Sequence, residues 1–353
     1  MAKTLSRKKA GRRAFEANIL DGLADAVILI DNNRTFVDGN EAAMNLLGSN
    51  VQGQDLAGVV NSAEVIEAVD NVLSGKAIER GEVHLPAPVS RICEMQVIDL
   101  PARNPDKPDW VMLVLRDITD ARKAEQMRAD FVSNVSHELR SPISSLLGFI
   151  ETLQGPARDD PQARERFLGI MEEEARRMTR LVNDLLTLSK VEAAEHIRPR
   201  EAVDLAQLLG EISTVLTGQG KSRDMQIALT VPDDLPAVAG DKEELIQVFR
   251  NLIDNALKYG DQGSVVQITA SPSENNSITT TIVNHGPGIQ ADDIPRLTER
   301  FYRADKGRSR ASGGTGLGLA IVKHIIGRHR GQIEISSVLG ETTSVSVSLP
   351  VLA

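Results

Sequence analysis

Residues 131–142 read Phe-Val-Ser-Asn-Val-Ser-His-Glu-Leu-Arg-Ser-Pro. The apolar members of this stretch recur at helical spacing and leave His137 on the polar face. A neutral imidazole keeps one ring nitrogen free as a nucleophile, and the carboxylate of Glu138 can orient or accept the proton on the other nitrogen. Pro142 has no N–H to bond the Glu138 carbonyl, so we expect a bend here. The His-Glu pair taken alone predicts a solvated pair on the helix surface, with a reactive histidine as the alternative.

This helix belongs to a longer helical block, residues 119–194, which is interrupted by a turn-rich break at 154–161. Apolar positions on one face of the first helix are Met127, Phe131, Val135, Leu139, Leu146, Ile150 and Leu153. The second helix repeats in steps of four and three at Phe167, Met171, Glu174, Met178, Leu181, Leu185 and Leu188. One antiparallel hairpin cannot cover both seams, whereas two hairpins can do so as a four-helix bundle. We therefore expect a homodimer.

Composition sets limits on the class of protein. The 353 residues are enough for two to three domains, and the net charge of -9 argues against non-specific nucleic-acid binding. The single cysteine, Cys93, excludes an intrachain disulfide and favours a reducing compartment. Residues 1–13 form a basic tail without a following apolar stretch, which is interpreted as solvated, with contact to anionic lipid as the alternative.

Residues 14–118 read as a small mixed α/β domain. A strand at 26–31, a polar turn and a return strand at 35–37 predict a hairpin, and a short helix is expected from Asn40 to Leu47 with Gly48 as its stop. Three further strands are expected at residues 81–85, 92–100 and 110–116. This order resembles a PAS domain, a resemblance that implies ligand sensing or dimerisation.

Residues 202–350 return to mixed α/β patterning. The helix expected at 241–258 is amphipathic, and a second helix is expected at 316–329. Strands are expected at residues 265–270, 278–283, 333–336 and 344–349. We expect a mostly antiparallel sheet covered on one face by helices.

Three motifs in residues 202–350 combine polar side chains or glycines in patterns that are typical of ligand binding. Asn251 and Asn255 are four residues apart and share a helix face, where amide oxygens can hold a hydrated Mg²⁺. Residues 284–289 read Asn-His-Gly-Pro-Gly-Ile after a strand. Residues 313–320 are glycine-rich and open a helix, a pattern that suits a phosphate cradle, and the preceding segment 301–310 is basic.

The order and spacing of these motifs, with the 131–142 stretch, resemble those of sensor histidine kinases. The resemblance covers residues 131–349 and implies a multidomain α+β chain, namely a PAS-like domain (14–118), a dimerisation and phosphotransfer hairpin (119–194) and an ATP-grip, or Bergerat-type, α/β sandwich (202–350). It implies that His137, with Glu138 beside it, takes a phosphoryl group from Mg²⁺-bound ATP and passes it to an aspartate of a response regulator receiver domain. It implies that Asn255 is the Mg²⁺ contact.

The resemblance also implies a set of ATP-binding residues. They are Asn251, Asn255, Lys258, Tyr259, Asn284, Gly286, Gly288, Ile289, Arg303, Lys306, Gly314, Thr315, Gly316, Leu317, Gly318 and Leu319. Two positions depart from the family pattern. Asn284 stands where an aspartate usually accepts the adenine amino group. Ser141 stands where a threonine or asparagine usually positions water for dephosphorylation of the partner. Residues 295–324 look especially like the phosphate-regulon subfamily (PhoR).

Two alternatives remain open. One is a scaffold of the same fold that dimerises and docks a regulator without catalysis. The other is an ATP-driven clamp of the gyrase type, which carries a glutamate general base where this chain has Asn251. We expect a cytoplasmic location, with a membrane attachment only if the native chain extends upstream of Met1.

Overall fold

The computed structural model describes residues 20–48, 51–86, 90–100, 110–232, 234–273, 276–304 and 314–352. The chain divides into two compact units, residues 1–132 and 133–353, and each is described by itself. The basic tail and Lys306 lie outside the described residues. In the described ranges, no helix is both long and apolar enough to cross a bilayer.

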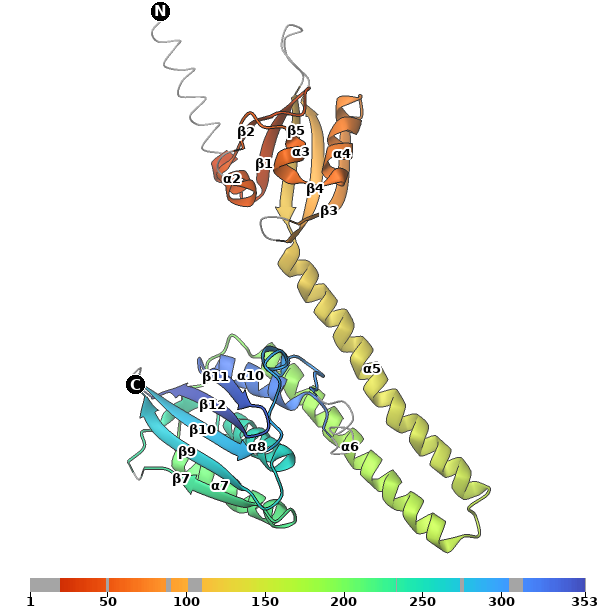
Figure 1. The fold of residues 1–353 in the computed structure, drawn as a ribbon, viewed down its shortest axis with the longest axis vertical. Helices are drawn as coiled ribbons and strands as arrows, with labels where there is room; N and C mark the ends of the chain where they lie inside the picture. The colour runs from red at the N-terminus through yellow and green to blue at the C-terminus, as the bar shows by residue number, and fades with distance from the viewer. Residues whose placement is uncertain are drawn as a thin grey trace, which may run out of the picture. The chain divides into compact units, whose positions relative to one another are not determined.

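The first unit is built on a five-stranded antiparallel sheet with strand order β2-β1-β5-β4-β3 (Figure 1). Its elements are β1 (Ala26–Asp31), β2 (Phe36–Gly39), α2 (Glu41–Leu47), α3 (Leu56–Val60), α4 (Ala63–Leu73), β3 (Ile78–Leu85), β4 (Arg91–Leu100) and β5 (Trp110–Asp117). Helices α2 and α4 pack against the sheet and close an apolar core. The predicted hairpin, short helix and three strands are confirmed, whereas α3 and α4 were not predicted.

One buried side chain explains the local path of the chain after the hairpin. Asn40 caps α2, and its Oδ1 accepts hydrogen bonds from the Val27 N–H at 2.9 Å and from the Ala43 N–H at 3.0 Å. The same side chain donates through Nδ2 to the carbonyls of Leu20 and Asp25. Asn40 therefore fixes the start of α2 to strand β1, as an N-cap with four partners can do.

A helical hairpin consists of α5 (Thr119–Gln154), which begins in the first unit and continues into the second, and α6 (Pro161–Ala193) of the second unit. Asp160 caps α6 by accepting from two backbone N–H groups, and Pro161 occupies the first turn, where its missing N–H costs nothing. Phe149 and Phe167 stack across the hairpin with ring centroids 5.4 Å apart. Helix α5 is assigned as one helix through Pro142, and the bend beside His137 stays a prediction.

The sequence prediction of a seam left exposed along α6 is wrong. Leu181 and Leu188 are only 4% and 1% exposed within a single chain, in which α6 packs against α10 (Gly318–Arg328) and Phe167 of the same seam stacks on Phe149 of α5. Six apolar side chains on the hairpin, of which only Ile150 belongs to the predicted seams, are 38 to 57% exposed: Ile143, Leu147, Ile150, Leu168, Val182 and Leu186. We call these six residues the outer stripe.

The rest of the second unit is a mixed five-stranded sheet, in the order β11-β12-β10-β9-β7, with a helical layer on one face (Figure 1). Its elements are β6 (Glu201–Val203), α7 (Leu205–Lys221), β7 (Gln226–Thr230), β8 (Val238–Gly240), α8 (Lys242–Tyr259), β9 (Val265–Ser273), β10 (Ser277–His285), the 3-10 helix η1 (Ile294–Arg296), α10, β11 (Gln332–Val338) and β12 (Thr342–Pro350). Strands β6 and β8 pair separately, and only β7 runs parallel to its neighbour within the five-stranded sheet.

This architecture confirms the predicted sheet covered by helices. The pairing of β10 with β12 joins residues 277–285 to residues 342–350. The intervening segment, 286–341, contains the glycine-rich stretch and α10. Nucleotide-type motifs are therefore inserted between two neighbouring strands of the sheet.

Candidate nucleotide site

A cleft of about 1220 Å³ opens between α8, α6 and the segments that follow β10 and precede α10. Predicted site residues that line it are Asn251, Asn255, Lys258, Tyr259, Asn284, Gly288, Ile289, Arg303, Gly314, Thr315, Gly316, Gly318 and Leu319. Gly286 and Leu317 do not line it, and Lys306 lies outside the described residues. The structure thus brings motifs from four separate parts of the chain to one cleft.

Helix α8 supplies one wall of the cleft. Asp241 caps its N-terminus, and its apolar face is buried, which turns Asn251 and Asn255 toward the cleft. Asn251 Nδ2 donates to the carbonyl of Gly318 at 3.3 Å and so links α8 to the start of α10. At the other end of α8, Arg223 donates to the carbonyls of Leu257 and Lys258. Such a guanidinium satisfies carbonyls that a helix C-terminus leaves without partners.

Lys258 is the cation at the centre of this wall. Burial lowers the pKa of Lys258 from 10.5 to about 8; Asp254 raises it, while Arg303 and two other guanidiniums lower it further. A side-chain carbon placed on Gly314 would lie 2.6 Å from Lys258 Nζ, so the ammonium sits directly against the glycine-rich segment. The pKa means that Lys258 can change its charge state between neutral and mildly alkaline pH.

We expect binding of a nucleoside polyphosphate in this cleft to weaken as the pH rises through about 8, because a neutral Lys258 no longer attracts anionic groups. With a pKa near 8, about one lysine in ten stays protonated at pH 9, so the dissociation constant should rise roughly tenfold between pH 7 and pH 9. Titration calorimetry measures this directly. The Lys258→Arg variant should lose the dependence, since a guanidinium stays protonated. A wild-type affinity that is flat over this range would contradict the role of Lys258.

The free energy of unfolding should change in the opposite sense where the two pH ranges overlap, between about pH 8 and 9. The folded-state pKa of Lys258 lies below that of the unfolded chain, so the unfolded state binds more protons between about pH 8 and 10.5. This group alone therefore makes the free energy of unfolding rise with pH there. Opposite signs for binding and stability separate loss of the cation from general alkaline unfolding.

The end of β10 supplies the opposite wall. Asn284 is 7% exposed and its Nδ2 donates to the His285 carbonyl at 3.4 Å. Gly288 has φ +69, and a side-chain carbon there would lie 2.5 Å from the Val338 carbonyl oxygen, so only glycine allows this path. Ile289 is fixed by its N–H, which donates to Ser337 Oγ at 3.0 Å. The wall combines a buried amide with tightly packed backbone.

The start of α10 supplies backbone at the third side of the cleft. Gly316 has φ +74, and a side-chain carbon there would meet the backbone of Phe301 at 2.9 Å. The Phe301 N–H donates to the Gly316 carbonyl at 2.9 Å. Leu317 is fully buried and anchors the segment in the core, while Gly318 and Leu319 face the cleft. N–H groups at a helix start favour anionic ligands.

Helix α6 contributes cleft residues that the sequence analysis missed, namely Arg180, Asn183 and Asp184. Asp184 Oδ2 accepts a hydrogen bond from the Thr315 hydroxyl at 2.7 Å. Burial raises the pKa of Asp184, while Thr315 and Arg180 lower it. The pattern of α6 marked these residues only as polar positions outside the seam, so no signal in the sequence assigned them to the cleft.

His137, Glu138 and Ser141 lie on α5 and do not line the cleft. His137 and Ser141 are exposed and one helical turn apart. Glu138 Oε2 accepts from Arg177 Nη2 of α6 at 2.9 Å, and Arg177 also pairs with Glu174 at 3.7 Å. The pairing explains the charged residue in the α6 seam: Glu174 belongs to a half-buried ionic cluster that holds Glu138 beside the histidine.

The combined chemistry of the cleft suits a nucleoside polyphosphate. Cationic side chains, backbone N–H groups at a helix start and amide oxygens meet around one large opening. None of the described residues that line the cleft comes from α5. A histidine acceptor on that helix therefore lies outside the cleft walls, and exposed His137 belongs to the same compact unit.

Three family models match successive parts of the chain. Residues 20–123 match the PAS fold, and residues 127–194 match the His Kinase A (phospho-acceptor) domain. Residues 240–353 match the histidine kinase-, DNA gyrase B- and HSP90-like ATPase. The residues matched by this last model include most of those that line the cleft.

Relatives match across these boundaries. The phosphate regulon sensor protein PhoR of Pseudomonas aeruginosa is 36% identical over 90% of this chain and 70% of its own length. The sensor histidine kinase WalK of Bacillus subtilis is 31% identical over 96% of this chain, which covers only 56% of that relative. The histidine kinase ThkA, solved in complex with the response regulator protein TrrA, shares the fold at 20% identity, a TM-score of 0.51, and coverage of 94% of this chain and 97% of that one. The chain belongs to the sensor histidine kinases.

Proposed function

We propose that the chain binds Mg·ATP in the cleft, phosphorylates its own His137 and passes the phosphoryl group to an aspartate of a response regulator. The observation that carries this proposal is the meeting of Asn251, Asn255, Lys258 and the start of α10 around one cleft. That cleft and an exposed histidine on a helix belong to one compact unit. In the proposal, residues 14–118 sense or dimerise, residues 119–194 accept phosphate, and residues 202–350 bind ATP.

The transfer needs little covalent chemistry from the protein beyond the nucleophile. One ring nitrogen of His137 attacks the γ-phosphorus, the bond to the β-bridging oxygen breaks, and ADP leaves. Glu138 orients the imidazole or accepts its proton, and Arg177 holds that carboxylate through a 2.9 Å hydrogen bond. Lys258 and Arg303, both in the cleft wall, neutralise charge on the phosphates.

The residues present fit a magnesium ion. Mg²⁺ prefers oxygen ligands, keeps several waters and bridges to phosphates, and the amide oxygen of Asn255 is a neutral donor of that kind at the cleft wall. When bound, the ion neutralises phosphate charge and orients the triphosphate. We assign the protein contact to Asn255, while Asn251 donates through its Nδ2 to the Gly318 carbonyl and links α8 to α10.

We propose that a second copy of the chain covers the outer stripe, which gives a homodimer. Soluble proteins rarely leave a long apolar stripe uncovered. The members Ile143, Leu147 and Ile150 follow the four–three spacing of a helical bundle seam. This places the dimer contact on a different face from the α6 seam that packs against α10.

We expect Leu147→Glu to convert the dimer to monomer or aggregate, because a carboxylate in an apolar interface costs on the order of several kcal/mol. Ser145→Glu is the matched control, since Ser145 is exposed on the opposite face of the same helix. Sedimentation velocity at micromolar concentration measures the outcome. By contrast, Leu181→Glu should unfold the packing of α6 against α10 within one chain. A Leu147→Glu variant that stays dimeric would contradict the outer-stripe interface.

The proposed partner is a receiver domain whose aspartate takes the phosphoryl group from His137. The complex of ThkA with the response regulator protein TrrA supports this class of partner. Ser141 lies one turn from His137 and keeps a hydroxyl that can position water for the reverse reaction. We propose a role in phosphate signalling on the similarity to PhoR, although relatives include WalK as well. The proposed cytoplasmic location rests on the sequence alone.

Incubation of the full chain with γ-labelled ATP tests the proposed function. Label that is lost in acid and kept in base identifies phosphohistidine and supports the kinase. Dimeric protein without label would identify a scaffold. Release of free phosphate without labelled protein would identify an ATP-driven clamp.

A further inference from the structure

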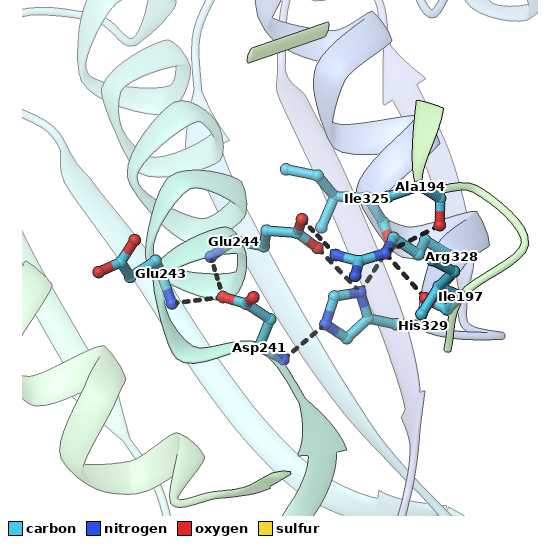
Figure 2. Close-up of polar contacts among 8 residues, drawn as sticks. All are labelled: Ala194, Ile197, Asp241, Glu243, Glu244, Ile325, Arg328 and His329. Carbon is cyan, nitrogen blue, oxygen red and sulfur yellow. Dashed lines mark hydrogen bonds and ion pairs between the residues drawn. The ribbon is translucent and has the colours of Figure 1, made fainter. Parts of the chain in front are cut away.

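A buried polar cluster joins the end of α6 to the ATP-binding domain, away from the nucleotide cleft. Figure 2 shows Arg328, the last residue of α10, between the chain after α6 and the first turn of α8. Arg328 Nε donates to the Ala194 carbonyl at 3.2 Å and to the Ile197 carbonyl at 2.9 Å. Its Nη1 pairs with Glu244 Oε1. The guanidinium of Arg328 therefore contacts the chain after α6 through Nε and helix α8 through Nη1.

The cluster is shielded from water and has one dominant cation. The side chains of Arg328 and Glu244 are only 12% and 19% exposed. His329 is fully buried; its Nε2 accepts from the Asp241 N–H at 3.0 Å and its Nδ1 donates to the Ile325 carbonyl at 2.8 Å. Burial lowers the pKa of His329, which keeps the ring neutral. The carboxylate of Glu244 thus depends on Arg328 for its charge partner.

The two elements joined by Arg328 have different roles in the proposed function. Ala194 is the C-cap of α6, the helix whose Phe167 and Arg177 contact α5. Glu244 lies in the first turn of α8, and Asn251 and Asn255 lie about two and three turns further along the same helix. Arg328 therefore connects the end of the acceptor hairpin to the helix that lines the cleft, although it touches neither the cleft nor His137.

We propose that Arg328 is a positioning residue that fixes the connection between the hairpin and the ATP-binding domain, and thereby sets the rate of phosphoryl transfer to His137 without affecting ATP affinity. This inference rests on the proposed function. The reasoning is geometric: transfer between two structural elements depends on their alignment, and small misplacements lower the rate strongly. Nucleotide affinity depends on groups inside the cleft, which Arg328 does not line.

The geometry requires a guanidinium rather than any positive charge. A planar fork can direct Nε to two carbonyls while Nη1 pairs with a carboxylate, whereas a lysine ammonium is a single point of contact. Arg328→Lys should therefore keep the pairing with Glu244 and lose the hold on Ala194 and Ile197. A purely charge-balancing role would instead be fully rescued by lysine.

The test compares full-length variants by three measurements. The double variant Arg328→Met/Glu244→Gln removes both charges together, which avoids a buried unpaired carboxylate. Autophosphorylation rate against ATP concentration gives kcat and KM, calorimetry gives ATP affinity, and hydrogen exchange reports on residues 194–203. Lys323→Ala, an exposed position on the same helix, is the control.

We expect the double variant and Arg328→Lys to lose at least tenfold in kcat, with KM and ATP affinity within threefold of wild type. Exchange in residues 194–203 should be at least tenfold faster, and Lys323→Ala should match wild type. The inference would be overturned if the double variant kept the wild-type autophosphorylation rate at saturating ATP, or if Arg328→Lys restored that rate fully. Unchanged hydrogen exchange in residues 194–203 would also overturn it. If the wild type takes no label, the proposed function fails, whereas the exchange result still decides whether Arg328 holds the connection.

Discussion

The His137→Ala variant is expected to incorporate no acid-labile phosphate from γ-labelled ATP, a loss of more than about 1000-fold, as removal of a nucleophile produces in other enzymes. His137 is exposed on α5, and the adjacent carboxylate is already held by Arg177 at 2.9 Å. ATP affinity should stay within about twofold of wild type, because His137 does not line the cleft. Scintillation counting of the washed protein and calorimetry measure the two quantities.

The control for this variant is another exposed histidine in the same unit. His196 lies after the end of α6 and has no contact with the nucleotide cleft, so His196→Ala should label like wild type. Residual acid-labile label in His137→Ala would move the phosphorylation site to another residue. Equal loss in His196→Ala would mean that the variants damage the fold rather than the nucleophile.

The Asn255→Ala variant is expected to lose both Mg²⁺-dependent ATP binding and labelling. We expect the affinity for Mg·ATP to fall roughly 100-fold. This is the upper end of the range found when a residue that hydrogen-bonds to a metal ligand is removed. Calorimetry with ATP in Mg²⁺ and in EDTA isolates the effect, since only the gain on adding Mg²⁺ should vanish. The dimer should persist, because Asn255 lines the cleft and none of the outer-stripe residues does.

Asn255→Asp is the informative companion. It keeps an oxygen donor for Mg²⁺ and should retain part of the Mg²⁺-dependent gain, although the added negative charge opposes the triphosphate. An alanine variant with near-normal Mg·ATP affinity would contradict the assignment of Asn255. Loss of binding that is equal with and without Mg²⁺ would instead point to a direct nucleotide contact.

The sequence predicted most of the regular elements because their causes are local. Asn40 and Gly48 bound α2 as expected, and Asp241 caps α8 directly before its amphipathic pattern begins. Helix α7 was missed, since Gly210, Gly218 and Gly220 weaken a helical pattern that tertiary packing then restores. Local signals therefore defined elements well except where packing overrides propensity.

The partners of the helix faces could not be predicted in the same way. Periodicity shows that Leu181 and Leu188 face something apolar, yet not that they are already buried within a single chain, in which α6 also packs against α10. Likewise, Asp184 meets Thr315 across 131 residues of sequence, a contact that no motif encodes. The glycine and asparagine motifs that the sequence predicted do line the cleft. The contribution of α6 to the cleft could not be predicted, because it depends on packing between distant parts of the chain.

The insertion of segment 286–341 between β10 and β12 has a consequence for folding and for sequence change. The ladder that pairs residues 277–285 with 342–350 can form only after the chain has closed a loop on the order of 50 residues, so it is expected to be a late step. Closing such a loop costs only about 1.5 kcal/mol more than closing a 10-residue loop. Changes in length within the loops of this segment, outside α10 and β11, therefore change the free energy of the sheet very little. We expect these loops at the cleft to tolerate insertions, while α10, β11 and the paired strands keep the sheet unchanged.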